Sequence, residues 1–169
     1  MNLGVARGQV RLADPMPAWA SLYETEAQRL RDALASLPAS VEHCGSTSVA
    51  GLVAKPILDI LVGVPAPVDV PAIRSALLPL GYEHATWAGV PGHEVFGRGE
   101  PRTHLLHVVP LGGEAWCRML AFRDALRASS ALRAEYDGLK RSLAERFPNQ
   151  RSRYTEGKSA FVSEVLARA

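Results

Sequence analysis

Residues 43–49 read His-Cys-Gly-Ser-Thr-Ser-Val, and residues 55–62 read Lys-Pro-Ile-Leu-Asp-Ile-Leu-Val. The second segment is typical of a buried strand, yet Asp59 places a carboxylate inside it. Because burying an unpaired charge is costly, we expect Asp59 to face a cation, a metal ion or a cleft. The turn Gly45–Ser48 offers small residues, hydroxyls and backbone N–H groups, which suit phosphate binding. We therefore predict that this turn and Asp59 line one cleft.

The length and composition indicate one soluble domain spanning residues 1–169. Hydrophobic residues make up 47% of the chain and charged residues 21%, which is ordinary for a globular protein. No apolar run is long enough to cross a bilayer, and residues 1–7 lack the apolar stretch of a signal peptide. Cys44 and Cys117 show no metal-binding spacing. We expect a cytoplasmic protein without a membrane partner.

The net charge of +2 is too small to argue for bulk nucleic-acid binding, so no nucleic-acid partner is expected. Its distribution is uneven, because residues 114–169 hold 11 Lys and Arg against 7 Asp and Glu, whereas residues 39–113 hold 4 against 6. A basic C-terminal third opposite an acidic middle would suit a polyanionic small molecule. Solvated helix faces are the alternative interpretation.

Hydrophobic periodicity predicts an α/β or α+β domain built on a mixed β-sheet. The expected helices cover residues 17–37, 70–80, 114–127, 130–147 and 150–167, so that one helix precedes the sheet and three follow it. The expected strands cover residues 41–44, 57–64, 82–87, 94–97 and 103–109, with a turn at residues 89–92. The continuous apolar run at 57–64 is typical of a central strand covered on both faces.

Several basic side chains are candidates for phosphate binding. Lys55 opens the strand that carries Asp59, and Arg98 and Arg102 flank a Gly-Glu-Pro turn where their guanidinium groups would clamp phosphate. The alternatives are an exposed strand-end lysine and a hairpin with solvated arginines.

Lys158 shares a predicted helical stripe with Tyr154, which would add a hydroxyl to the site, and Lys140 shares a face with Tyr136. A lysine on such a stripe either extends to solvent or points into a polar pocket. We predict that Lys158 reaches the Asp59 cleft.

His104 and His107 lie three residues apart on one predicted strand, so they should point to opposite faces. We expect only one of them to face Asp59 and favour His107. Ser46 and Thr47 either bind phosphate or cap a short helix.

Four segments, at residues 43–52, 54–60, 102–108 and 154–158, closely resemble the GrpB family. The resemblance covers nearly the whole chain. The family is assigned to the nucleotidyltransferase superfamily, whose fold is similar to the catalytic domain of DNA polymerase beta. It implies a mixed sheet of nucleotidyltransferase-like topology, with a Gly-Ser turn at a helix start and metal-binding carboxylates on the next strand.

Carried onto this sequence, the resemblance implies that Gly45 and Ser46 hold a triphosphate and that Asp59 is the first metal-binding acid. Leu61 stands where a second acid is expected, and His104 or His107 stands where a third is expected. It follows that one weakly held divalent ion, Mg²⁺ or Mn²⁺, is expected rather than a pair. We expect Asp59→Asn to weaken metal binding, and to leave the fold intact or raise its stability.

The leading hypothesis is a protein that binds a nucleoside triphosphate and transfers its nucleotidyl group to an unidentified small acceptor. The expected catalytic residues are Asp59, His107 and Lys158, and the expected metal ligands are Asp59, His107 and His104. The expected phosphate-binding residues are Gly45, Ser46, Thr47, Ser48, Lys55, Arg98, Arg102, Lys140 and Tyr154. The alternatives are a non-catalytic nucleotide-binding module with a decayed metal site, or a metal-dependent hydrolase that Glu94 near Asp59 would favour. The sequence leaves the oligomeric state open.

Overall fold

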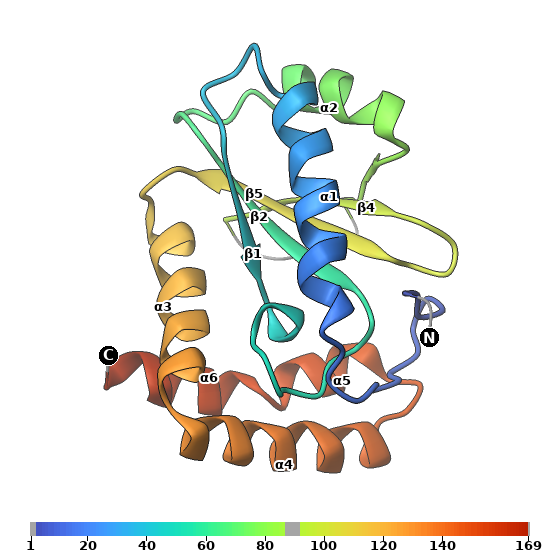
Figure 1. Ribbon diagram of the computed structural model, residues 1–169, viewed down its shortest axis with the longest axis vertical. Helices are drawn as coiled ribbons and strands as arrows, with labels where there is room; N and C mark the ends of the chain where they lie inside the picture. Colours follow the sequence, from blue (N-terminus) through green and yellow to red (C-terminus); the bar gives the residue numbers. More distant parts are fainter. Residues whose placement is uncertain (1–2, 87–91, 169) are drawn as a thin grey trace.

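A computed structural model describes residues 3–86 and 92–168, which form a five-stranded mixed sheet with helices on both faces (Figure 1). The first half contains α1 (Ala18–Ala33), β1 (Ser40–Cys44), the 3₁₀ helix η1 (Ser46–Ser48), β2 (Leu58–Val64), α2 (Val70–Leu77), η2 (Leu78–Leu80) and β3 (Glu83–His84). The second half contains β4 (Glu94–Arg98), β5 (His104–Pro110), α3 (Glu114–Ala128), α4 (Ser130–Arg146), α5 (Arg151–Glu156) and α6 (Ser159–Ala167). The predicted α/β class with a mixed sheet is confirmed. No helix in the two described ranges is both long and apolar enough for a membrane span.

The strands lie in the order β1-β2-β5-β4-β3. Strands β2 and β5 are parallel and in register from the Leu58–His104 pair to the Val64–Pro110 pair, and the other neighbours are antiparallel. The apolar run at residues 57–64 is therefore a central strand, as predicted. The predicted strand at 82–87 is reduced to β3, while Trp87 and residues 89–91 of the predicted turn lie outside the described residues.

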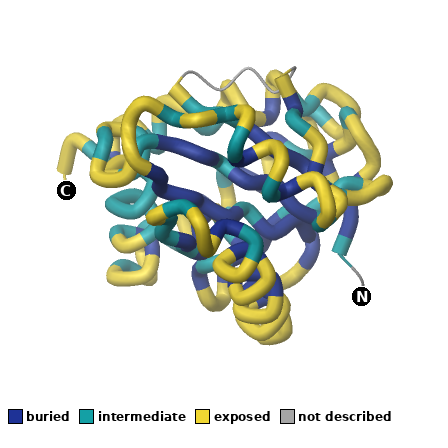
Figure 2. The backbone as a smooth tube through the Cα atoms, turned by 90° about the horizontal axis from the view of Figure 1, so that it is seen from above, coloured by how far each residue is buried: buried dark blue, intermediate teal, exposed yellow. Residues whose placement is uncertain are grey.

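The two faces of the sheet carry different helices. Helices α1 and α2 pack on one face, where alternate residues of the central strands are buried: Leu58, Ile60, Val62, Leu106 and Val108. On the other face, Leu61 and Val109 contact Trp116 and Met119 of α3. Seen from above, the buried strands run through the middle of the molecule with exposed turns around them (Figure 2). Asp59 and His107 belong to the α3 face, because strand neighbours alternate in direction.

The predicted helix at 150–167 is divided into α5 and α6, so that four helices rather than three follow the sheet. The division falls at Gly157 and Lys158. A Cβ atom at Gly157 would come within 2.5 Å of Leu143 Cδ2 in α4, so a glycine allows the chain to pass this close to α4. The helical pattern of the sequence continues across the break, which is why periodicity alone did not reveal it.

A buried ion-pair network joins α1 to the strands it covers. Glu26, in α1, accepts hydrogen bonds from both terminal nitrogens of Arg98, each at 2.8 Å, and from the Tyr82 hydroxyl at 2.9 Å. Burial alone would raise the pKa of the Glu26 carboxyl, but the hydrogen bonds from Arg98 and Tyr82 bring that pKa below its usual value. Arg98 also lies 3.0 Å from Nε2 of His104.

This network corrects two predictions. Arg98 and His104 pair across β4 and β5 and point to the α1 face, opposite the face of Asp59. The guanidinium of Arg98 is held by Glu26 and is not available to clamp phosphate at Asp59. His104 likewise cannot bind a metal ion held by Asp59, because the sheet lies between them.

Arg98→Met should lower the free energy of unfolding by about 2–3 kcal/mol, because it leaves the Glu26 carboxylate buried without its main cation. The loss is smaller than for a buried carboxylate without any partner, because Tyr82 and Arg29 still donate hydrogen bonds to Glu26. Urea denaturation would measure this loss of stability. Arg74→Met, at an exposed position of α2, is the matched control. A variant of normal stability that fails to bind nucleoside triphosphate would show that Arg98 is a phosphate ligand after all.

Candidate functional site

Asp59 is the second residue of β2 and lies against the glycine turn. It pairs with Cys44 of β1 on one side and with Leu105 of β5 on the other. Gly45 has φ +64°, and a Cβ atom on it would lie 2.5 Å from Oδ2 of Asp59. Only glycine fits this position, both for its left-handed conformation and for the close approach of the carboxylate. The turn and Asp59 are therefore in contact, and the cleft that they were predicted to line together stays a prediction.

Two histidines lie in a row beside Asp59. Nε2 of His107 is 3.7 Å from Oδ1 of Asp59, and Nδ1 of His107 is 3.3 Å from Nδ1 of His93. The prediction that only one of His104 and His107 faces Asp59, with His107 favoured, is therefore confirmed. His93 was missed, because its place beside His107 depends on the pairing of Val95 with His107, two residues further along β4.

Four basic side chains from three parts of the chain form a group that includes the cationic neighbours of Asp59; we call Lys55, Arg102, Arg151 and Lys158 the basic cluster. Lys55, Arg151 and Lys158 interact electrostatically with the Asp59 carboxylate. The ammonium groups of Lys158 and Lys55 lie 4.6 and 5.6 Å from the centre of the buried Tyr154 ring. These three cations share one carboxylate, so the site has an excess of positive charge.

Burial and the excess of positive charge change the pKa values of the side chains in the site. Burial and the neighbouring charge of Lys55 lower the pKa of Lys158 to about 7. Burial also lowers the pKa of Lys55. Burial by itself would raise the pKa of the Asp59 carboxyl, but His107, Lys55 and Lys158 together hold that pKa below its usual value. Asp59 is therefore ionised at neutral pH, and an added anion would stabilise the protonated form of Lys158.

Arg102 and Arg151 extend the basic cluster away from Asp59. Both line a small cavity of about 30 Å³ together with Lys55 and Arg7. Arg102 also donates a hydrogen bond of 2.5 Å to Glu83, at the outer edge. Burial is the main cause that lowers the pKa of Arg151, and Arg102 and Arg7 add to it. Arg151 was not predicted, although the basic character of residues 114–169 pointed to its region.

Three predicted phosphate ligands have a structural role in the turn instead. Lys140 is buried and donates hydrogen bonds to the Val53 carbonyl and, at 3.3 Å, to the Ser46 hydroxyl. Thr47 bonds His43 at 3.0 Å, and the Ser48 hydroxyl donates to the Gly45 carbonyl at 2.6 Å. These contacts hold η1 against α4 and β1, and so they position the turn rather than face a ligand.

The side chains around Asp59 do not fit a pair of protein-held metal ions. Leu61, at the position of a second acid, is buried beneath α3. Glu94 points to the α1 face and bonds His84 at 2.8 Å, so it is not near Asp59. Within residues 3–86 and 92–168, no group of three or more His, Cys, Asp or Glu side chains could hold a metal. A single ion shared by Asp59 and His107 does fit, since their facing atoms are 3.7 Å apart.

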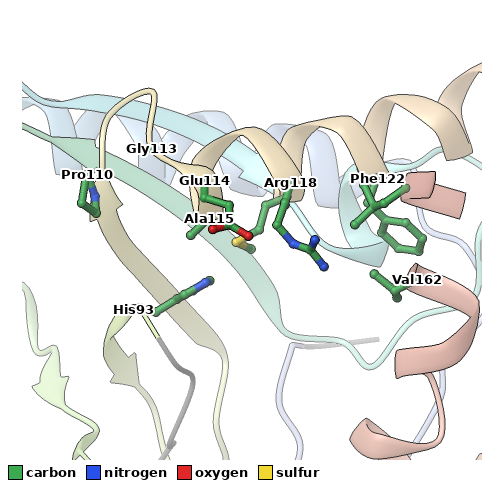
Figure 3. A pocket seen from close by; sticks show the side chains of 11 residues that line it. His93, Pro110, Gly113, Glu114, Ala115, Arg118, Phe122 and Val162 are labelled. Carbon is green, nitrogen blue, oxygen red and sulfur yellow. The ribbon is translucent and has the colours of Figure 1, made fainter. Parts of the chain in front are cut away.

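A groove of about 610 Å³ opens next to the histidines, between the β4–β5 pair, α3 and α6 (Figure 3). We call it the α3–α6 groove. His93 and Pro110 lie on its sheet side, Met119 and Phe122 come from α3, and Val162 and Leu166 come from α6. Two exposed charged residues of α3, Glu114 and Arg118, also line it.

Asp59→Asn should reduce the stability at pH 7, in contrast to the expectation from sequence. The structure gives the Asp59 charge three cationic neighbours, so its removal leaves them to repel one another. We expect a loss of about 1–2 kcal/mol, less than for a fully buried pair because the Asp59 side chain is 30% exposed. The lowered pKa means that this contribution is present above about pH 4, the usual pKa of Asp, and fades as the pH falls through the folded-state pKa.

Urea denaturation of both proteins from pH 3 to pH 8 measures this difference, and Mn²⁺ titration calorimetry measures the expected loss of metal affinity. Asp69, which caps α2 far from the cluster, gives the control variant Asp69→Asn. An Asp59→Asn protein at least as stable as the parent at pH 7 would contradict the charge pairing described above.

Comparisons with known proteins agree on the family. The sequence pattern described as "GrpB protein" matches residues 9–168. The glutamate-rich protein GrpB of Alkalihalophilus pseudofirmus is 37% identical over 170 residues, covering 97% of this chain and 98% of that protein. The UPF0157 protein PA4798 of Pseudomonas aeruginosa is 40% identical over 162 residues, covering 90% of this chain and 64% of the relative.

Solved structures agree as well. The crystal structure of GrpB from Enterococcus faecalis has a TM-score of 0.82 at 35% identity, covering 92% of this chain and 94% of that one. The Cid1 poly(U) polymerase, in a MgGTP-bound crystal structure, has a TM-score of 0.55 at 12% identity over 79% of this chain and 44% of its own. At that identity the likeness concerns the fold alone, which is nucleotidyltransferase-like. The chain belongs to the GrpB family.

Proposed function

We propose that this protein binds a nucleoside triphosphate at the Asp59 site and transfers its nucleotidyl group to a small acceptor. The observation that carries the proposal is the meeting of Lys55, Arg151 and Lys158 around one carboxylate, directly beside the Gly45 turn. A nucleotidyltransferase-like fold and a Cid1 structure with bound MgGTP are consistent with a nucleotide as the anion.

Each part of the site has a role in this proposal. The basic cluster binds the phosphates and offsets the charge that builds up on the leaving pyrophosphate, which is the main requirement of phosphoryl-type transfer. Gly45 lets the Asp59 carboxylate lie against the turn, and Lys140 keeps the turn in place through Ser46 and Val53. The ring of Tyr154 packs against the ammonium groups of Lys55 and Lys158 and helps to position them.

Asp59 and His107 are the two side chains that would hold a divalent ion, Mg²⁺ or Mn²⁺, entering with the triphosphate. When bound, such an ion supplies further neutralisation of phosphate charge. The cations of the basic cluster neutralise the rest of the phosphate charge.

A second candidate function is nucleotide binding without catalysis. Leu61 favours it, because a buried leucine at the second-acid position removes a ligand that a two-ion reaction needs. Both candidates require the same binding site and differ only in whether pyrophosphate is released.

Lys158→Met should weaken binding of a nucleoside triphosphate about 10- to 100-fold, equivalent to the roughly 1.5–3 kcal/mol of a hydrogen bond to a charged group. Methionine keeps most of the apolar stem and removes the charge. Titration calorimetry with ATP, GTP, CTP and UTP, each with and without Mn²⁺, is the measurement. Arg74→Met removes one positive charge from α2 and is the matched control. Equal affinity of Lys158→Met and Arg74→Met for the nucleotide bound by the parent protein would refute the site.

Mass spectrometry separates the candidate reactions. The parent protein is incubated with the nucleotide it binds, Mn²⁺ and a bacterial metabolite extract, with Asp59→Asn as the control. Pyrophosphate release together with a new nucleotidyl adduct supports transfer, and pyrophosphate release without an adduct supports a hydrolase. Tight binding with neither product supports the non-catalytic module.

A further inference from the structure

We infer that the α3–α6 groove is the acceptor site and that it takes a small amphipathic molecule carrying a carboxylate and a hydroxyl group. This inference rests on the proposed function, since an acceptor has meaning only beside a bound nucleoside triphosphate. It goes further by assigning the acceptor a place in the structure and a chemical class.

The first argument is the order of groups along the sheet. At one end, Arg102 precedes β5 and lies in the basic cluster with Lys55 and Arg151. At the other end, Pro110 closes β5 and lines the groove. His107 lies between the two ends and faces Asp59. The end of the basic cluster formed by Lys55, Arg102 and Arg151 and the groove therefore lie toward opposite ends of β5, with His107 between them.

This order suits an in-line displacement. In nucleotidyl transfer the attacking and leaving oxygens lie roughly in line across the phosphorus atom. With pyrophosphate held in the basic cluster, the attacking oxygen has to arrive from the groove side. A bond forms between the acceptor oxygen and the α-phosphorus, and the bond from that phosphorus to the bridging oxygen breaks. The electron pair leaves with pyrophosphate, and the hydroxyl proton passes to solvent.

The second argument is the position of His93. Its ring points from the sheet side into the groove, toward α3 (Figure 3). Its Nδ1 is 3.3 Å from Nδ1 of His107, so it connects the groove to the histidine beside Asp59. His93 is therefore the side chain through which a molecule in the groove would contact the Asp59–His107 pair.

The third argument is the chemistry of the groove wall. The half-buried side chains of Met119, Phe122 and Val162 give it an apolar surface suited to a hydrocarbon body. Arg118, at the rim, makes no hydrogen bond or ion pair with the residues that the structure describes. A guanidinium group recognises a carboxylate through two parallel hydrogen bonds. Glu114, one helical turn away, disfavours a second negative charge, so the ligand carries one.

The binding test uses hexanoate as the probe and hexan-1-ol as its uncharged counterpart. In an NMR titration of the parent protein, hexanoate should shift the resonances of His93 and Met119. Hexan-1-ol should bind at least tenfold more weakly. Arg118→Gln, an exposed substitution, should weaken hexanoate about tenfold and leave nucleoside-triphosphate affinity unchanged. Arg31→Gln, at an exposed position of α1, is the matched control for charge.

The outcomes separate this inference from the proposed function. Loss of nucleotide binding in Lys158→Met together with no hexanoate binding in the parent overturns the acceptor groove alone. Arg118→Gln could instead lower the nucleotide affinity, with nucleotide-induced shifts at Met119. That result would make the groove part of the nucleotide site and would also overturn the inference. A parent protein that binds hexanoate in the groove but no nucleotide at all refutes the proposed function, and with it the meaning of the groove as an acceptor site.

Discussion

The charge of Asp59 is the constraint on which the site depends. A carboxylate at the start of a central strand has to be compensated, and the compensating charges are Lys55, just before the strand, and Arg151 and Lys158, in the C-terminal part of the chain. Arg151 lies at the start of α5, and Lys158 lies between α5 and α6, where Gly157 allows the chain to pass close to Leu143 of α4. The C-terminal helices thereby complete a site that the sheet begins.

The two faces of the sheet divide the work between stability and function. On the α1 face, Glu26 and Arg98 form a buried pair whose hydrogen bonds are satisfied internally. On the α3 face, cations outnumber carboxylates and the groups remain partly exposed. An arrangement in which fixed lysines and arginines outnumber carboxylates is suited to an anion, whereas a metal-centred site would need the opposite balance. The shortage of carboxylates near Asp59 has two causes: a buried leucine, Leu61, stands at the second-acid position, and Glu94 points to the other face of the sheet.

Local patterns in the sequence predicted most of the fold, and long-range packing determined what they missed. The apolar run around Asp59, the glycine turn and the alternation that separates His104 and His107 onto opposite faces are all properties of a few neighbouring residues. Arg98 looked the same as Arg102 in the sequence, because its partner Glu26 lies 72 residues away in α1. His93 and Arg151 were missed for the same reason, since each becomes a site residue only through a contact with a distant segment. The division at Gly157 was hidden because the apolar stripe continues through it.

A crystal structure grown with Mn²⁺ and a non-hydrolysable analogue of the nucleoside triphosphate that the protein binds tests the central claim most directly. The account predicts triphosphate density between the Gly45 turn and the ammonium groups of Lys55 and Lys158, with at most one anomalous Mn²⁺ peak, beside Asp59 and His107. Phosphates bound elsewhere, or a triphosphate directed into solvent away from Lys158, would contradict it.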